Sequence, residues 1–305
     1  MPQEDDVSTI LQAVGVKRAV RLASRRNKVF RALMRDGSQC IVKIYSPELR
    51  HRLPLERSVL EKASVLRHGE PIVRVPELLG EYCEPNGAAL LIEYVPGENL
   101  CDVLNQDISL GRETPGMYMR ALAQWYSGFH GRFSASRGTT LLRGDSILRN
   151  FIVSEKKPGP GARFGPGRDT YSTAGPDTCF VVGVDFEQAR EGDPAADIGE
   201  ICCSILDTHP MFTAEKVGLC RELIEAYTQL SGYKDIRRIQ EEIASSMKVV
   251  ASRRPRQKHI IQKKLAIFQK EGFCGLVKDV PEAAVCDNAA VRPYNASTGD
   301  QRYSH

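Results

Sequence analysis

Two polar loops, each attached to a short apolar strand, are the strongest constraint on the fold of this 305-residue chain. The first loop carries Asp145 and Asn150 and leads into the apolar run 151–153, and the second begins with Asp185 after the β-branched run 180–184. A phosphoryl-transfer site needs one carboxylate to orient a hydroxyl, and an amide oxygen and a second carboxylate to hold Mg²⁺. The pattern therefore predicts that two strand ends bring these three side chains to one site.

The order of these residues resembles the aminoglycoside phosphotransferase branch of the protein-kinase-like superfamily. The catalytic loop of that branch, His-Gly-Asp-x4-Asn, corresponds to residues 143–150, and its metal loop, Asp-Phe-Glu, corresponds to residues 185–187. The resemblance extends over residues 19–232. It implies an α+β protein with two lobes: a small lobe with an antiparallel sheet and one main helix, and a larger, mostly helical lobe.

The same resemblance assigns roles to individual residues. Asp145 would be the catalytic base, and Asn150 and Asp185 would be the metal ligands. Glu93 and Val95 stand at the position of the family's interlobe hinge, where backbone groups bind adenine. The implied cofactors are ATP and Mg²⁺. The implied reaction transfers the γ-phosphoryl group to a hydroxyl of a small molecule, which we expect to be sugar-like or anionic.

Lys43 lies within the apolar strand pattern 40–45, where a lysine requires a partner. By resemblance, it contacts the α and β phosphates of ATP and pairs with a glutamate of the helical segment 53–67. Glu56 falls on the apolar stripe of that segment, whereas Glu61 is rotated away from it. We therefore prefer Glu56 as the partner and keep Glu61 as the alternative. The alternative that involves no functional site is that Lys43 is an exposed lysine on an edge strand and that the two glutamates lie on the surface.

Changes in periodicity and composition suggest the domain boundaries. We expect an N-terminal nucleotide-binding lobe over residues 1–95, because strand-like alternation dominates there. A helical catalytic lobe is expected over residues 96–274, interrupted by a flexible insertion at 154–178 that is rich in Pro and Gly. Residues 275–305 are predicted to be a disordered tail.

Composition narrows the compartment and the partners. A net charge of +4 is too small to indicate a nucleic-acid binder. No apolar run reaches membrane-spanning length, and the acidic N-terminus lacks the features of a signal peptide, so we expect a cytoplasmic protein without a membrane span. The nine cysteines include no Cys-x-x-Cys pair, which favours reduced thiols over a disulfide framework or a zinc site.

Departures from the family pattern leave other functions open. Arg143 stands where the family has His, Ile147 occupies a position that is often polar, and segment 22–28 contains no glycine. A non-catalytic nucleotide-binding pseudokinase would tolerate these changes. An atypical protein kinase, RIO-like or associated with tRNA modification, also uses a Gly-Asp-x4-Asn loop. The basic C-terminal third favours an anionic acceptor, either a small molecule of unknown identity or a macromolecule.

Overall fold

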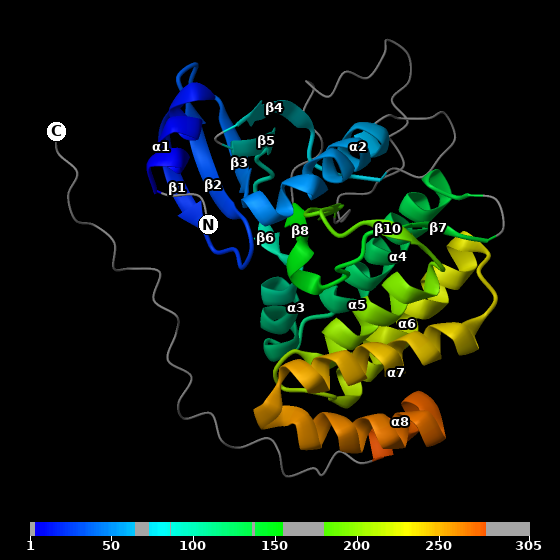
Figure 1. The fold of residues 1–305 in the computed structure, drawn as a ribbon. Coiled ribbons are helices and arrows are strands. Elements are labelled where there is room, and N and C mark those ends of the chain that lie inside the picture. The colour runs from blue at the N-terminus through cyan, green and yellow to red at the C-terminus, as the bar shows by residue number, and fades with distance from the viewer. Residues whose placement is uncertain (1–3, 65–72, 86, 136–137, 155–179, 279–305) are drawn as a thin grey trace.

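The computed structural model describes residues 4–64, 73–85, 87–135, 138–154 and 180–278. An antiparallel sheet forms the N-terminal part of the chain, and helices form most of the C-terminal part (Figure 1). The predicted insertion beyond Ser154 lies almost wholly outside the described residues, as does the predicted tail beyond Lys278. No helix of the described ranges combines the length and apolar character that crossing a bilayer requires.

The N-terminal sheet has five antiparallel strands in the order β1-β2-β3-β5-β4. The strands are β1 (Val16–Leu22), β2 (Lys28–Met34), β3 (Gln39–Tyr45), β4 (Leu78–Glu84) and β5 (Gly87–Glu93). The hairpin between β2 and β3 turns at Asp36 and Gly37, an Asp-Gly pair that is typical of tight hairpin turns. Gly37 adopts a φ of +87°, a conformation that glycine accepts without steric cost, and Asp36 Oδ1 accepts a hydrogen bond from the backbone of Ser38.

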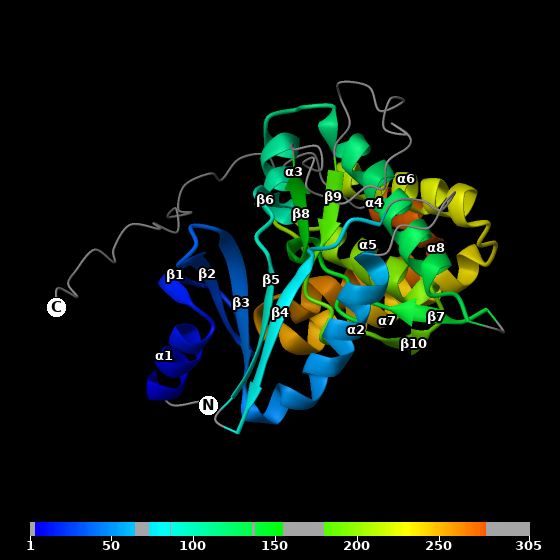
Figure 2. The ribbon, with the colours of Figure 1, turned by 90° about the horizontal axis from the view of Figure 1, so that it is seen from above.

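Two helices cover opposite faces of this sheet, namely α1 (Glu4–Ala13) and α2 (Leu53–Ser64) (Figure 2). Because successive side chains of a strand alternate between faces, β3 contributes to both layers. Val42 and Ile44 pack in the core on the α1 side, and Tyr45 packs in the core on the α2 side. Lys43 alternates with Val42 and Ile44, so it faces the α2 side, where the C-terminal part lies.

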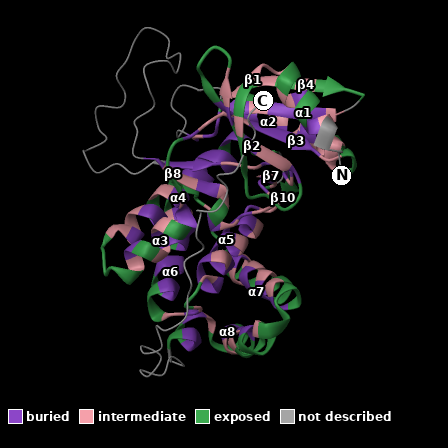
Figure 3. Cartoon of the chain, turned by 90° about the vertical axis from the view of Figure 1, so that its left-hand side faces the viewer, coloured by how far each residue is buried: buried purple, intermediate pink, exposed green. Residues whose placement is uncertain are grey.

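Six helices form most of the described C-terminal part. They are α3 (Leu100–Ser109), α4 (Thr114–Arg132), α5 (Ala195–Asp207), α6 (Ala214–Ser231), α7 (Ile236–Arg253) and α8 (Lys258–Lys278). Most positions of α4 and α5 are buried, whereas α7 and α8 keep exposed sides (Figure 3). The segment α8 is kinked at Gly272, where φ is +61°, and its last part runs past the expected boundary at 275. Leu276 in this part is fully buried and extends the apolar core to that point.

Short strands connect the helices and carry the polar loops. β8 (Phe151–Ser154) lies between β6 (Glu98–Asn99) and β9 (Phe180–Gly183). β7 (Thr140–Leu142) pairs with β10 (Arg190–Gly192). The loop that carries Asp145 and Asn150 therefore runs from β7 to β8, and the loop that begins near Asp185 runs from β9 to β10. The two loops are adjacent because β8 and β9 are paired.

Trp125 of α4 holds β9 in place. Its ring stacks on Phe129 with 4.9 Å between centroids and meets Phe151 edge-on at 5.2 Å. A Cβ added to Gly183 would lie 2.3 Å from the Trp125 ring, so only glycine lets the end of β9 approach this closely. Trp125 Nε1 also donates a hydrogen bond of 2.8 Å to the carbonyl of Arg74. The helix thus sets the position from which Asp185 projects.

Candidate functional site

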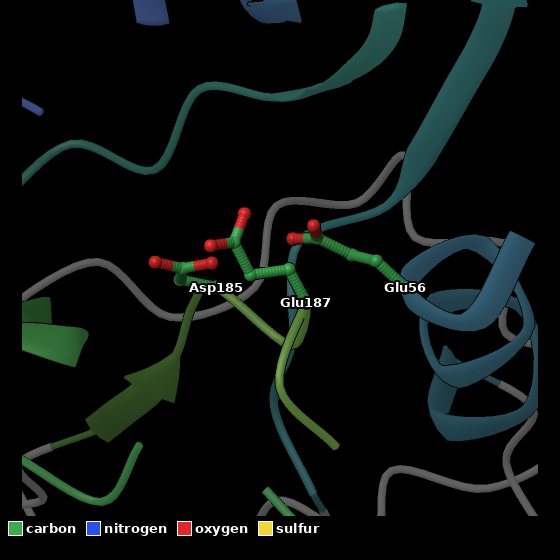
Figure 4. Close-up of side chains that lie close together, drawn as sticks. All are labelled: Glu56, Asp185 and Glu187. Atoms are coloured by element: carbon green, nitrogen blue, oxygen red, sulfur yellow. The ribbon is translucent and has the colours of Figure 1, made fainter. Parts of the chain in front are cut away.

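Lys43 lies at the centre of three carboxylates. Its Nζ is 2.7 Å from Glu56 Oε2, 2.6 Å from Asp185 Oδ1 and 3.1 Å from Glu187 Oε2. Glu56 comes from α2, whereas Asp185 and Glu187 follow β9, and the three carboxylates point toward one another (Figure 4). The ammonium group therefore joins the sheet, the helix α2 and the loop after β9 at one place.

The structure pairs Lys43 with Glu56 and not with Glu61. Glu56 is buried, and it also accepts hydrogen bonds from the hydroxyl of Tyr45 and from the backbone N–H of Phe186. The side chain of Glu61 is 57% exposed and points away from the cluster. The apolar stripe of α2 explains this difference, because it turns Glu56 toward the core and Glu61 toward solvent.

Lys43 and its carboxylate partners stabilise one another in their charged forms. Burial acts to lower the pKa of Lys43, but the nearby Glu56, Asp185 and Glu187 outweigh it and raise that pKa above the ordinary lysine value. Burial likewise acts to raise the pKa of Asp185. The Lys43 ammonium, through its charge and its hydrogen bond, outweighs this effect, so the pKa of Asp185 lies below its usual range. Both groups are therefore charged at neutral pH.

Asp145 and Asn150 contact each other within the loop between β7 and β8. Asn150 Nδ2 donates to the backbone carbonyl of Asp145 at 3.0 Å and to its carboxylate Oδ2 at 3.2 Å. Within the described ranges, no group hydrogen bonds to the side-chain oxygen of Asn150. The amide nitrogen thus orients Asn150 on Asp145, and the amide oxygen keeps its capacity to bind a cation.

Gly144 allows this loop to make its turn. Its φ is +79°, and a Cβ added there would lie 2.0 Å from the carbonyl oxygen of Gln188. Any side chain would therefore push the loop away from the stretch that follows Asp185. This close approach keeps Asp145 beside the second polar loop.

Arg143 connects the two loops through its buried guanidinium. Its nitrogens donate to the backbone carbonyls of Asn150 and Asp185, each at 3.2 Å, and to the carbonyl of Val184. The guanidinium also lies over the Phe151 ring, 4.5 Å from its centroid. The Arg143 side chain thus uses its donors on protein carbonyls. It therefore contributes to the position of Asp185 from within the core.

Asp197 holds the start of the loop between β7 and β8. Its carboxylate accepts hydrogen bonds from the backbone N–H of Arg143 at 2.8 Å and from the hydroxyl of Ser146 at 2.7 Å, and it lies 3.1 Å from His130 Nε2. Asp197 lies inside the first turn of α5, and Pro194 occupies the N-cap position of that helix. These bonds and the charge of His130 outweigh the effect of burial and lower the pKa of Asp197.

The two expected hinge residues lie apart from this cluster. Glu93 ends β5, and its carboxylate pairs with Arg74 at 2.7 Å and accepts the backbone N–H of Glu77 at 3.1 Å. Val95 is buried in the connection between β5 and β6. In the described part of the chain, neither contacts the Lys43 cluster. Their expected contact with adenine involves backbone groups and stays a prediction.

Sequence reasoning did not assign Glu187 and Asn27 to the site. Glu187 is buried and contacts Lys43, the side-chain amide of Asn27 and, at 3.9 Å, Arg26. The position of Glu187 in the Asp-Phe-Glu sequence was the signal that could have identified it as a site residue. Asn27 lies in the glycine-free connection between β1 and β2, where periodicity gives no indication that the side chain reaches across to Glu187.

The donor set fits Mg²⁺. This ion prefers hard oxygen ligands from carboxylates, carbonyls and water. The Asp185 side chain is 39% exposed and contacts Lys43 through Oδ1, and the Asn150 side chain offers its amide oxygen. Glu56 and Glu187, at 1% and 5% exposed, are more enclosed and hold the lysine. Asp185 is therefore the most accessible member of the carboxylate group Glu56, Asp185 and Glu187, whose oxygens lie close enough together to share an ion, and Asn150 offers a further oxygen from the neighbouring loop.

Comparison with known protein families gives no match for this chain, and no similar sequence is found among curated proteins. The fold is α+β, with a five-stranded antiparallel sheet followed by a helical region. Because one fold can support many activities, the function has to be argued from the side chains of the site.

Arg143→Met should lower the free energy of unfolding by about 3 kcal/mol, because buried hydrogen bonds to charged groups contribute about 1.5–3 kcal/mol each and the freed carbonyls would lack a donor. Urea denaturation followed by circular dichroism measures this change. Arg149→Met is the matched control, since the Arg149 side chain is 69% exposed in the same loop. Equal urea midpoints for the two variants would contradict the role of Arg143.

Proposed function

We propose that this protein is an ATP- and Mg²⁺-dependent kinase that transfers the γ-phosphoryl group to a hydroxyl acceptor, and that it has a two-lobed protein-kinase-like fold. The observation that carries the proposal is the ion pairing of Lys43 with both Glu56 and Asp185. It joins a lysine of the sheet to the metal loop. Asp145 and Asn150 lie in the neighbouring loop, connected to Val184 by a backbone hydrogen bond of 2.9 Å.

Each of these residues has a distinct part in the reaction. Asp145 orients the acceptor hydroxyl and takes its proton as the oxygen forms a bond to the γ-phosphorus. The bond between that phosphorus and the β–γ bridging oxygen breaks, and ADP leaves. Asp185 and Asn150 hold Mg²⁺, which neutralises charge on the phosphates. Lys43 binds the α and β phosphates, and Glu56 keeps the lysine in position.

The exposure of the cluster supports a role for a cation. Three carboxylates surround the ammonium of Lys43, and the positive charges of Arg26 and Arg143 act on Glu187 and Asp185. The Asp185 side chain is 39% exposed, whereas those of Glu56 and Glu187 are 1% and 5% exposed. Asp185 is therefore the carboxylate that would bind a divalent ion, and Lys43 would then exchange this partner for phosphate.

Acceptor-dependent ADP release by the purified protein tests the proposal. We would supply ATP and MgCl₂ with sugars, amino alcohols, aminoglycosides and generic proteins in parallel. Release above the background without acceptor, abolished by EDTA, is the expected result, and mass spectrometry would show the phosphorylated acceptor. ATP binding without transfer to any acceptor would contradict the proposal and favour a pseudokinase. Transfer to proteins alone would favour an atypical protein kinase.

A further inference from the structure

An open surface pocket of about 360 Å³, hereafter the cavity, lies beside the candidate site. The end of the 3₁₀ helix η1 (Pro47–Arg52) and the start of α2 line one side of it, and the stretch after the metal loop lines the other. This volume is in the range of small-ligand pockets, about 300–1,000 Å³. Three of the lining residues can carry positive charge, and none is acidic. The lining residues are His51, Arg52, Leu55, Gln188, Ala189 and Arg190.

Arg52 has an unused set of hydrogen-bond donors. Its side chain makes no hydrogen bond or ion pair with any residue that the structure describes, and its Nη1 is buried. Other arginines nearby do have partners: Arg50 donates to Cys83 Sγ at 3.2 Å, and Arg57 pairs with Glu81 at 2.6 Å. Because a buried donor without an acceptor is unfavourable, the Arg52 guanidinium is well suited to an anionic ligand.

The second arginine places this cavity next to the catalytic loop. Arg190 Nη1 donates to the backbone carbonyl of Gly144 at 3.2 Å, and Gly144 directly precedes Asp145. Glu56 and Glu187 are held by Lys43, whereas the carboxylate of Glu200 interacts electrostatically with Arg190. Arg52 is therefore the cavity residue whose positive charge forms no ion pair with any described carboxylate.

We propose that this cavity binds an anionic oxygen group, a phosphate or a carboxylate, through Arg52 and Arg190, with His51 at the edge. Guanidinium groups suit such ligands because they present paired N–H donors that match two oxygens at once. The next inference rests on the proposed kinase function: the acceptor is a hydroxyl compound that already carries a phosphate. The cavity would hold that phosphate while the hydroxyl reaches Asp145. Free inorganic phosphate is the alternative ligand, because it offers the same anionic oxygens to the two arginines.

Calorimetric titration of the full chain with inorganic phosphate tests the cavity without any turnover. Arg52→Gln should raise the Kd for phosphate about tenfold, since a charge-assisted hydrogen bond contributes at least about that factor. Arg190→Gln should also weaken binding. Arg50→Gln removes the same charge from the same 3₁₀ helix outside the cavity, and it should bind phosphate as the parent does. No phosphate binding by the parent, or equal binding by a folded Arg52→Gln variant, would overturn the proposal.

Matched acceptors distinguish the source of the anion. ADP release would be compared for glucose and glucose 6-phosphate, and for ribose and ribose 5-phosphate, with the parent and with Arg52→Gln. A lower KM for the phosphorylated member, lost in Arg52→Gln, supports an acceptor-borne phosphate. If kcat/KM is equal for the two members of each sugar pair while phosphate binding still depends on Arg52, the proposed acceptor class is wrong. The ligand of the cavity is then free inorganic phosphate. Phosphate binding without any ADP release would mean that the kinase proposal fails while the anion site stands.

Discussion

Asp145→Asn should reduce the rate of phosphoryl transfer by about a thousandfold while ATP binding is retained, because a positioned general base contributes roughly 10²–10⁴ in rate. An amide can still accept a hydrogen bond from the acceptor hydroxyl, but it cannot take the proton. ADP release with a competent acceptor measures the loss, and fluorescence titration with a nucleotide analogue measures binding.

Asp235→Asn is the matched control for this substitution. Asp235 caps the N-terminus of α7 by accepting the backbone N–H of Arg238 at 2.9 Å, and asparagine caps helices equally well. The control should therefore keep both the fold and the turnover of the parent. If Asp145→Asn released ADP as fast as this control, the assignment of Asp145 as the base would be wrong.

Asp185→Asn should remove Mg²⁺-dependent activity almost completely, with a loss in kcat on the order of a thousandfold or more, because charge neutralisation carries most of this type of catalysis. Asparagine is the appropriate replacement because Asp185 has a φ of +67°, a left-handed conformation that Asn tolerates better than most residues. A loss of activity in this variant can then be attributed to the lost carboxylate charge and not to a strained backbone.

A Mg²⁺ titration separates this effect from the loss of the base. The Asp185→Asn variant should need a much higher Mg²⁺ concentration for ATP binding, whereas Asp145→Asn should show the Mg²⁺ dependence of the parent. Identical Mg²⁺ dependence for parent and Asp185→Asn would show that the metal is held elsewhere in the chain.

Local patterns in the sequence predicted much of the sheet and its lysine. Residues 39–45 form β3 as expected, because their alternation of apolar side chains suits a strand covered on both faces. The preference for Glu56 over Glu61 followed from helical periodicity alone, and the structure pairs Glu56 with Lys43. Spacing within one helix or strand was sufficient in these cases.

Residue spacing within one helix or strand could not predict contacts between segments that are distant in the sequence. Asn27 and Glu187 are 160 positions apart, and nothing in either local pattern signals their contact. The role of Arg143 was equally hidden, because its acceptors are backbone carbonyls that any sequence would supply. The cavity lined by Arg52 and Arg190 exists only because α2 packs against the stretch that follows the metal loop.

The carbonyl of Arg74 accepts hydrogen bonds from both Trp125 Nε1, at 2.8 Å, and the backbone N–H of Gly183, at 3.1 Å. Arg74 belongs to the segment that leads from α2 into β4, so its carbonyl helps to join the strand-rich half of the molecule to the helical half, as does the hydrogen bond from the backbone of Phe186 to Glu56. One oxygen is thus shared by α4 and by the end of β9. A change at Trp125 would therefore alter both the packing of α4 and the seat of the strand that carries Asp185.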